Sequence, residues 1–310
     1  ESSLPYERHS ASVYDVVMLD EDTAVSGSSD GTVRVWNAQT GECIRTIPVA
    51  SLGVSCLAVP PGSDDLVAVG CKDAADTTFP TLMKGGADRT GIIRLIDIDD
   101  GDIEAEYATH RGWVRSLAYG PEGRLFSTAD DGTLQIHEPY KPTIVLEKHL
   151  GGVLDVDVSA DGQRALTSGR DGTVRLWDIA SESQAAVMKS HRGWVESVLF
   201  AGDGVHAYSA GRDGRIIKWN LQTGEQISQM EHGAWVRTLC LTPDGNMLYA
   251  AGKDDRISCW NLETEEQVAE LTGHEEDVLS AIVTPGGDTL ITASADNTLL
   301  VWDSPGASGQ

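Results

Sequence analysis

The sequence predicts an all-β fold built from repeated antiparallel sheets. The prediction starts from residues 149–178, where three apolar runs show the alternation of half-buried strands: Val153–Val158, Ala165–Thr167 and Val174–Trp177. Asp-Gly pairs at 161–162 and 171–172 separate the runs, and such pairs favour tight hairpin turns. A single small sheet has nowhere to bury its inner face, so this unit must pack against copies of itself.

Copies of the unit recur along the chain. The position of Trp177 is occupied in turn by Trp36, Ile96, His137, Trp177, Trp219, Trp260 and Trp302, at steps of 60, 41, 40, 42, 41 and 42 residues. A period near 40 residues with four strands per unit is typical of a β-propeller. We therefore expect seven blades of four antiparallel strands in a single domain over residues 1–310.

The two ends and the second unit depart from the period. Nothing after Trp302 resembles a fourth strand, so we expect residues 1–8 to complete the last blade and close the ring without a free sheet edge. The second unit carries about 19 extra residues, mostly within 72–90, between its second and third strands. This insertion is interpreted either as a lid or second contact surface, or as a segment without a role. Residues 304–310, rich in Pro, Gly and Ser, are expected to be a flexible tail.

Four positions recur together: a His, a Ser or Thr, an Asp in a turn, and the Trp. One such set alone would suggest a nucleophilic triad, but near-identical copies around a ring indicate a structural hydrogen-bond device. The GxSxG match at residues 27–31 precedes a predicted strand and not a helix, so Ser29 is not expected to be a nucleophile. The complete sets are His9, Ser26, Asp30, Trp36; His149, Thr167, Asp171, Trp177; His191, Ser209, Asp213, Trp219; and His274, Thr292, Asp296, Trp302.

With these sets the chain resembles the WD-repeat family of β-propellers over essentially its whole length. The resemblance implies that the sets are the family's structural tetrads. It also implies that partners contact the residues flanking the first-strand Val and the residue before the turn Asp. Carried over to this sequence, the candidate partner-binding residues are Tyr14, Trp113, Arg115, Arg170, Trp194, Arg212, Trp235, Arg237 and Lys253.

Tryptophan beside arginine is the composition of an interface anchor, so these positions predict an aromatic and basic cup for an acidic or phosphorylated peptide. Two alternatives stay open: the tryptophans plug the channel while the arginines pair with acids such as Glu196 or Asp130, or the mouth binds a small molecule. The predicted function is a non-catalytic scaffold that binds a peptide or partner domain at the central mouth. The competing functions are a linking domain of a larger bacterial-type signalling enzyme such as a kinase, and a propeller-based enzyme.

Composition narrows the class of partner. The formal charge of −25 disfavours nucleic acid and anionic lipid, and it either keeps the protein soluble or helps it to dock basic partners. Five cysteines without CxxC spacing predict neither a disulfide framework nor a metal site and favour a reducing, cytoplasmic location. No apolar run is long enough to span a membrane. We expect no catalytic residue and no cofactor, and a monomer as an isolated domain; because the chain starts at Glu1, we expect a processed protein or a domain of a longer one.

Overall fold

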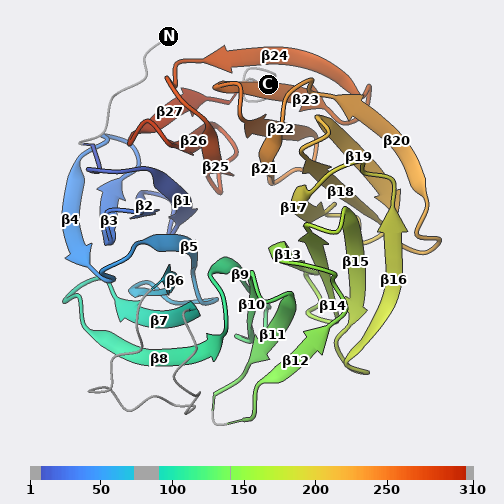
Figure 1. Ribbon diagram of the computed structural model, residues 1–310. Helices are drawn as coiled ribbons and strands as arrows, with labels where there is room; N and C mark the ends of the chain where they lie inside the picture. The colour runs from blue at the N-terminus through green and yellow to red at the C-terminus, as the bar shows by residue number, and fades with distance from the viewer. Residues whose placement is uncertain (1–7, 73–90, 140, 305–310) are drawn as a thin grey trace.

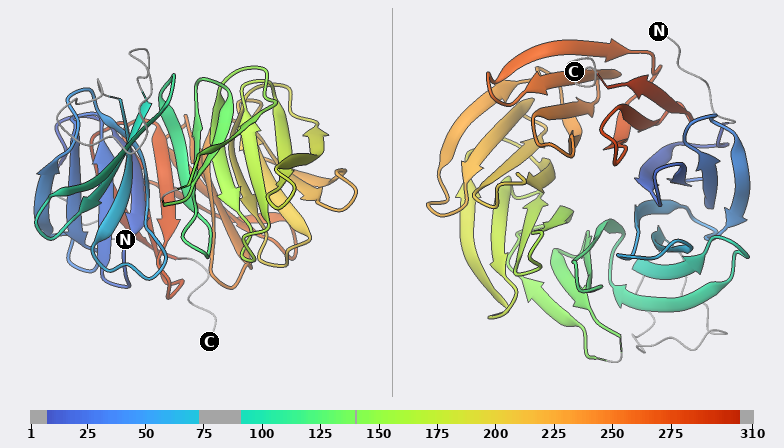
Figure 2. Two further views of the ribbon diagram at one scale, coloured as in Figure 1. Left: turned by 90° about the horizontal axis from the view of Figure 1, so that it is seen from below. Right: turned by 180° about the vertical axis from the view of Figure 1, so that it is seen from behind.

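The computed structural model describes residues 8–72, 91–139 and 141–304, and these residues form 27 strands and no helix. The strands are grouped into seven sheets arranged as blades around a central axis (Figure 1), and side views show a disc with loops on both faces (Figure 2). The fold is thus an all-β seven-bladed propeller, as predicted. The described part of the chain contains no helix that could cross a membrane.

Each blade is an antiparallel meander whose strands follow one another from the axis outward. The strands of blades one to three are β1 (Val13–Met18), β2 (Thr23–Ser28), β3 (Thr32–Asn37), β4 (Cys43–Pro48), β5 (Val54–Ala58), β6 (Leu66–Lys72), β7 (Gly91–Asp97), β8 (Ile103–His110), β9 (Val114–Tyr119), β10 (Leu125–Ala129), β11 (Thr133–His137) and β12 (Ile144–Glu147). Those of blades four to seven are β13 (Val153–Val158), β14 (Arg164–Gly169), β15 (Thr173–Asp178), β16 (Ser183–Lys189), β17 (Val195–Phe200), β18 (His206–Gly211), β19 (Arg215–Asn220), β20 (Gln226–Glu231), β21 (Val236–Leu241), β22 (Met247–Gly252), β23 (Arg256–Asn261), β24 (Glu266–Thr272), β25 (Val278–Val283), β26 (Thr289–Ser294) and β27 (Leu299–Asp303).

The turns form where the sequence predicts them. Gly162 and Gly172 adopt φ values of 68° and 74°, a left-handed conformation that glycine reaches without steric penalty. They connect β13 to β14 and β14 to β15, and the pairing register Val158↔Ala165 and Ser168↔Val174 follows from these short turns. The Asp-Gly spacing therefore sets the register of the meander.

A β-bulge interrupts the first strand of every blade directly after the Val that begins the strand, for example between Val153 and Asp155 in β13. A bulge re-aims the extra residue, here toward the axis of the ring. The seven bulge residues all line a central cavity of about 140 Å³: Tyr14, Ser55, Arg115, Leu154, Glu196, Arg237 and Leu279.

Apolar side chains fill the spaces between neighbouring blades. Leu166 and Val174 of blade four pack with Val198 and Ile217 of blade five, and all four are buried. At the boundary where the ring closes, the Ser280 hydroxyl of blade seven donates to Oδ1 of Asp15 in blade one. The last sheet has three described strands, and the predicted closing strand in residues 1–8 lies outside the described residues except for Arg8. The insertion at 73–90 and the tail at 305–310 also lie outside them.

Candidate interaction site at the mouth of the propeller

The four complete sets of recurring polar residues form hydrogen-bonded chains. In blade four, Nδ1 of His149 lies 3.0 Å from Oδ1 of Asp171 and Nε2 lies 2.8 Å from Oγ1 of Thr167. The indole N–H of Trp177 donates to the same hydroxyl at 2.9 Å. The three contacts recur in blades one, five and seven, within the sets His9, Ser26, Asp30, Trp36; His191, Ser209, Asp213, Trp219; and His274, Thr292, Asp296, Trp302.

Hydrogen bonds within these tetrads hold the turn Asp in its charged form. Burial alone would raise the pKa of Asp131 in blade three, but hydrogen bonds from His110 and the N–H of Arg111 outweigh burial and lower that pKa to about 2. The same balance lowers the pKa of the turn Asp in the four complete tetrads, Asp30, Asp171, Asp213 and Asp296. The stability that these carboxylates contribute is therefore present above their unfolded pKa and is lost as the pH falls through the folded pKa.

Blades three and six each lack one member of the tetrad, and other side chains make the remaining hydrogen bonds in each. In blade three, Nε2 of His137 lies 2.8 Å from the Ser127 hydroxyl, so an imidazole stands in for the indole. In blade six, Ala250 has no hydroxyl, and His232 instead contacts Ser258 through Nδ1 and Asp254 through Nε2, which reverses the ring relative to the other blades. Within the described part of the chain, the buried Trp260 indole N–H has no hydrogen-bond partner.

Blade two has a buried ion pair instead of a tetrad. Nε of Arg94 lies 3.0 Å from Oε2 of Glu106, and both side chains are almost fully buried. The Arg94 guanidinium also donates to the backbone carbonyl of Val49 in blade one. This charge pair links the outer part of blade two to its neighbour.

Sequence reasoning missed three half-buried aspartates that connect adjacent blades. Asp155 accepts from the Val198 N–H and the Ser197 hydroxyl of blade five and from the Ser116 hydroxyl of blade three. Asp157, on the same strand, accepts from the Phe200 N–H at 2.7 Å. Burial raises the pKa of Asp157 to about 7, with the charge of Asp155 acting in the same direction.

The third aspartate closes the ring. Asp15 of blade one accepts from the Leu57 N–H of blade two at 2.8 Å and from the Ser280 hydroxyl of blade seven at 2.7 Å. Burial raises the pKa of Asp15 to about 6. The detectable signal was an Asp inside an apolar strand run, a position that makes sense only when the carboxylate has partners outside its own sheet.

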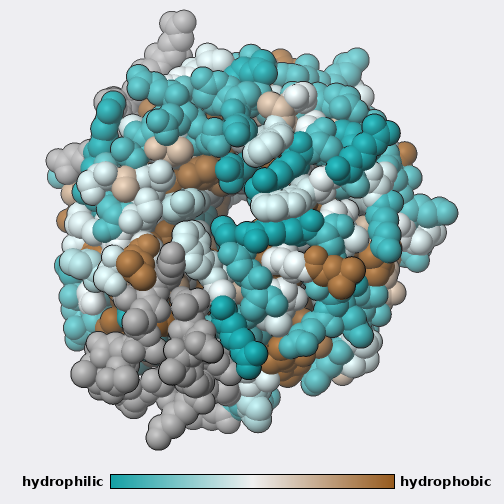
Figure 3. Space-filling model, in the orientation of Figure 1, coloured by the Kyte–Doolittle hydropathy of each residue, from teal (hydrophilic) through white to brown (hydrophobic). Residues whose placement is uncertain are grey.

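One face of the disc carries the loops that enter each blade and the loops between its second and third strands, because successive antiparallel strands alternate in direction. Six of the nine predicted partner-binding residues lie in these loops: Trp113, Arg170, Trp194, Arg212, Trp235 and Lys253. Tyr14, Arg115 and Arg237 are bulge residues that line the central cavity. Space-filling views show a narrow opening at the centre of the ring within a largely hydrophilic surface (Figure 3).

The loop residues form a continuous stack of alternating cations and aromatic rings, here called the cation–π ladder: Arg170, Trp194, Arg212, Trp235 and Lys253. The guanidinium carbon of Arg212 lies 3.6 Å from the Trp194 ring centroid and 4.7 Å from that of Trp235. Arg170 covers Trp194 at 4.6 Å, and Nζ of Lys253 covers Trp235 at 4.2 Å. All four distances fall within the range of favourable cation–π contact. Blades four, five and six thus share one preorganised surface.

Carboxylates form ion pairs with the two arginines of the ladder. Asp130 bridges Arg115 and Arg170, with closest distances of 2.6 and 2.7 Å, and Oε1 of Glu196 accepts from Nε of Arg212 at 2.5 Å. Trp113 stacks against Arg115 at 5.3 Å and extends the chain of contacts to blade three. Among the described residues, neither the Nη atoms of Arg212 nor Nζ of Lys253 has a hydrogen-bond partner or an ion pair, so these donors are available to a ligand.

The charge of the mouth changes sign at blade seven. Lys253 borders a pocket of about 570 Å³ that is lined by Asp255, Glu275, Glu276 and Asp277. Asp277 lies 3.5 Å from Nε of Arg237. The basic surface is therefore an arc over blades three to six and does not extend around the ring. No three His, Cys, Asp or Glu side chains of the described residues come together as a metal site.

Comparisons with known proteins agree with this architecture. The chain is 31% identical over 188 residues to a guanine nucleotide-binding protein subunit beta of Oryza sativa subsp. japonica, a match that covers 57% of this chain and 47% of the relative. It is 28% identical over 182 residues to a ribosome biogenesis protein WDR12 homolog of Nematostella vectensis, covering 56% and 39%. The chain thus spans less than half the length of these curated relatives.

Among solved structures, the WD40 beta propeller domain of Doa1 is similar in fold, with a TM-score of 0.82 at 22% identity and coverage of 96% of this chain and 95% of that one. The family model described as WD domain, G-beta repeat, matches residues 2–37, 101–138, 140–178, 182–220, 224–261 and 265–303. These six matches cover most of the chain, and the gap at 38–100 contains β4 of blade one and the first three strands of blade two, β5, β6 and β7. The protein therefore belongs to the WD40 repeat family.

Proposed function

We propose that this protein is a non-catalytic interaction scaffold that binds an acidic or phosphorylated peptide segment at the mouth of the propeller. The cation–π ladder is the observation that carries the proposal. Stacking holds the Arg212 guanidinium between two rings, and its Nη atoms have no partner among the residues that the structure describes, so a carboxylate or phosphate meets donors already in place. An anchor that is rigid before binding loses little side-chain entropy on complex formation.

Local charge supports an anionic ligand despite the acidity of the whole chain. Five cations of the mouth, Arg115, Arg170, Arg212, Arg237 and Lys253, are matched by the three neighbouring acids Asp130, Glu196 and Asp277. At physiological salt the screening length is about 8 Å, so a ligand on the ladder responds to these groups more than to distant acids. We place the acidic group of the ligand over blades four to six and not over blade seven.

The relatives fit a scaffold role, because one is named as a subunit of a guanine nucleotide-binding protein and another as a ribosome biogenesis protein. All five cysteines are free thiols. From these free thiols we infer a cytoplasmic location. We also infer that the isolated domain is a monomer.

A peptide array tests the proposal. Wild type should capture acidic and phosphorylated peptides in a salt-sensitive manner, and the double reversal Arg170→Glu with Arg212→Glu should lose that capture. The matched control, Arg45→Glu with Lys189→Glu, changes the charge equally on the exposed outer strands β4 and β16. Capture of basic peptides, or capture indifferent to the ladder reversal, would contradict the proposal.

A further inference from the structure

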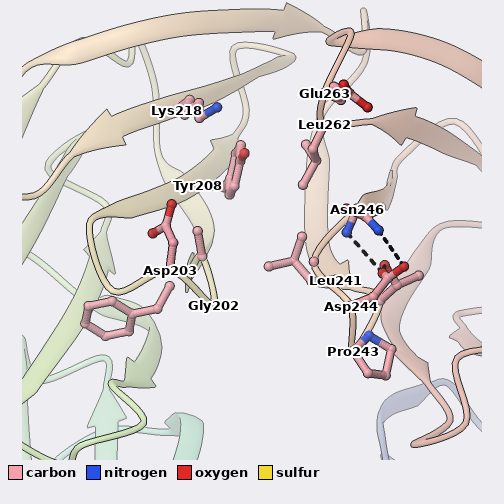
Figure 4. Close-up of a pocket in the computed structure, with 14 residues that line it drawn as sticks. Gly202, Asp203, Tyr208, Lys218, Leu241, Pro243, Asp244, Asn246, Leu262 and Glu263 are labelled. Carbon is pink, nitrogen blue, oxygen red and sulfur yellow. Dashed lines mark hydrogen bonds between the residues drawn. The ribbon is translucent and has the colours of Figure 1, made fainter.

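A second concave site lies between blades five and six, on the opposite face of the disc from the mouth. Its walls come from the β17–β18 loop, the β21–β22 loop and the chain after β23, and its volume is about 650 Å³. These are the loops that follow first and third strands, which alternate in direction with the strands that lead to the mouth. Figure 4 shows Tyr208, Leu241 and Leu262 facing the space between the two blades.

Three apolar side chains and one phenol line this groove between its polar loops. Phe200, Leu241 and Leu262 are half-buried around it, and Tyr208 is only 3% exposed. The Tyr208 hydroxyl lines the groove and forms no hydrogen bond with any described residue. A nearly buried phenol with an unused donor and acceptor is suited to a ligand backbone or side chain.

The rim of the groove is acidic. Asp203, Asp244 and Glu263 border it, and the one cation among the lining residues, Lys218, lies 3.6 Å from Oε1 of Glu265. Asp203 accepts from the Val205 N–H and pairs with Nδ1 of His206 at 2.5 Å, and Asp244 accepts from the Thr242 hydroxyl, whereas the Glu263 carboxylate has no partner among the described side chains. The Arg164 guanidinium lies 5.6 Å from the Phe200 ring centroid at the β17–β18 side, so the negative charge of the rim is concentrated on the opposite side, at Asp244 and Glu263.

We propose that this groove binds a basic peptide segment, in which an apolar side chain enters between Phe200 and Leu241 and a flanking Lys or Arg pairs with Glu263. Charge complementarity selects this occupant, because an acidic or neutral segment would leave the Asp244 and Glu263 carboxylates without counter-charges. The volume is within the range of pockets that hold a ligand larger than one side chain. The groove is independent of the mouth, so the two proposals can fail separately.

Fluorescence anisotropy with two labelled hexapeptides tests the proposal. One has a Trp-Leu centre flanked by two lysines on each side, and its twin carries glutamates instead. The basic peptide should bind, and Glu263→Lys should weaken it about two- to fivefold, as expected for one exposed ion pair. The matched control is Glu21→Lys, which makes the same change at an exposed carboxylate in the β1–β2 loop on the same face.

A blocking variant separates the groove from general attraction to an acidic protein. A Cβ at Gly202 meets no atom within 4 Å, so Gly202→Trp can fill the groove without a clash and should weaken the basic peptide about tenfold, the effect of losing one anchor. Arg212→Glu should leave this affinity unchanged. Equal binding of both peptides, or equal loss with Glu21→Lys, would overturn the proposal. So would dimerisation that Gly202→Trp abolishes, because a second copy would then be the occupant.

Discussion

Single polar atoms explain why some blades keep the tetrad and others do not. A hydroxyl at the Thr167 position lets the buried indole N–H find an acceptor, and Ala250 removes that acceptor in blade six. An unsatisfied buried donor lowers stability by about 1–3 kcal/mol. Among the tryptophans that the structure describes, Trp260 of blade six is therefore the one whose buried indole N–H lacks an acceptor.

Restoring the hydroxyl should stabilise the protein. We expect Ala250→Ser to raise the free energy of unfolding by about 1 kcal/mol, because the new Oγ can accept from the Trp260 indole. Urea unfolding followed by circular dichroism measures the change. The control is Ala210→Ser in blade five, where the same hydroxyl enters an apolar cluster and should destabilise. Equal effects of the two substitutions would show that the unpartnered indole is unimportant.

Elements with the same strand order can be held by different chemistry. Blade two lacks the tetrad, and its buried Arg94–Glu106 pair instead joins its third strand, β7, to its fourth strand, β8. Removing one member leaves a buried charge, whereas replacing both leaves none.

Blade two should therefore respond asymmetrically to mutation. We expect Arg94→Leu to lower the free energy of unfolding by about 3–5 kcal/mol, since Glu106 is left buried without its counter-charge. The double variant Arg94→Leu with Glu106→Leu should recover much of that loss. Chemical denaturation of the three proteins measures both steps. If the double variant is no more stable than the single one, the pair acts through packing and not through charge.

Loops of the mouth should be separable from the blades that carry them. Trp194 and Trp235 stack on cations above the sheets, so Trp194→Ala with Trp235→Ala should abolish peptide capture while the melting temperature hardly changes. The same double variant decides against the alternative made from the sequence. A large drop in melting temperature would show that both rings are plugs of the channel.

Asp15, Asp155 and Asp157 connect neighbouring blades around the ring by accepting hydrogen bonds from them. Burial raises the pKa of Asp157 to about 7, above its value of about 4 in the unfolded chain, so folding takes up a proton between these limits. The contribution of Asp157 to stability must rise as the pH falls from 8 to 5. Below about pH 4 the tetrad aspartates act in the opposite sense, because their folded pKa values are lowered.

Asp157→Asn should remove the first of these effects. We expect the free energy of unfolding of the wild type to rise relative to that of Asp157→Asn as the pH is lowered from 8 to 5. The change should be at most about 1.4 kcal/mol per pH unit. Denaturation curves at matched ionic strength provide the measurement. Parallel pH profiles for the two proteins would mean that Asp157 does not change its protonation on folding.

The repeat period was enough to predict the seven-bladed ring. The side-chain contacts between neighbouring blades could not be predicted from it. Trp-Asp spacing and alternating apolar residues define seven sheets because each sheet is a local meander. The contact of Asp155 with Ser116 and Val198 joins three blades, and no spacing within one repeat reveals it. Likewise, the aromatic and basic positions of the mouth were visible in the sequence. Their stacking order depends on loop geometry between neighbouring repeats.

The tryptophans of this chain differ in solvent exposure, so the fluorescence of those at the mouth can be told apart from that of the buried ones. Trp36, Trp177, Trp219 and Trp260 are buried in the blades, and Trp302 of blade seven is half-buried, whereas Trp113, Trp194 and Trp235 are partly open to solvent beside cations. Iodide, an anionic quencher, should reach the second group and be attracted to it by the neighbouring guanidinium and ammonium groups. Once Trp302 is replaced by Phe, emission from the mouth can therefore be separated from that of the interior without a label, and occupancy of the ladder can be followed as protection from iodide.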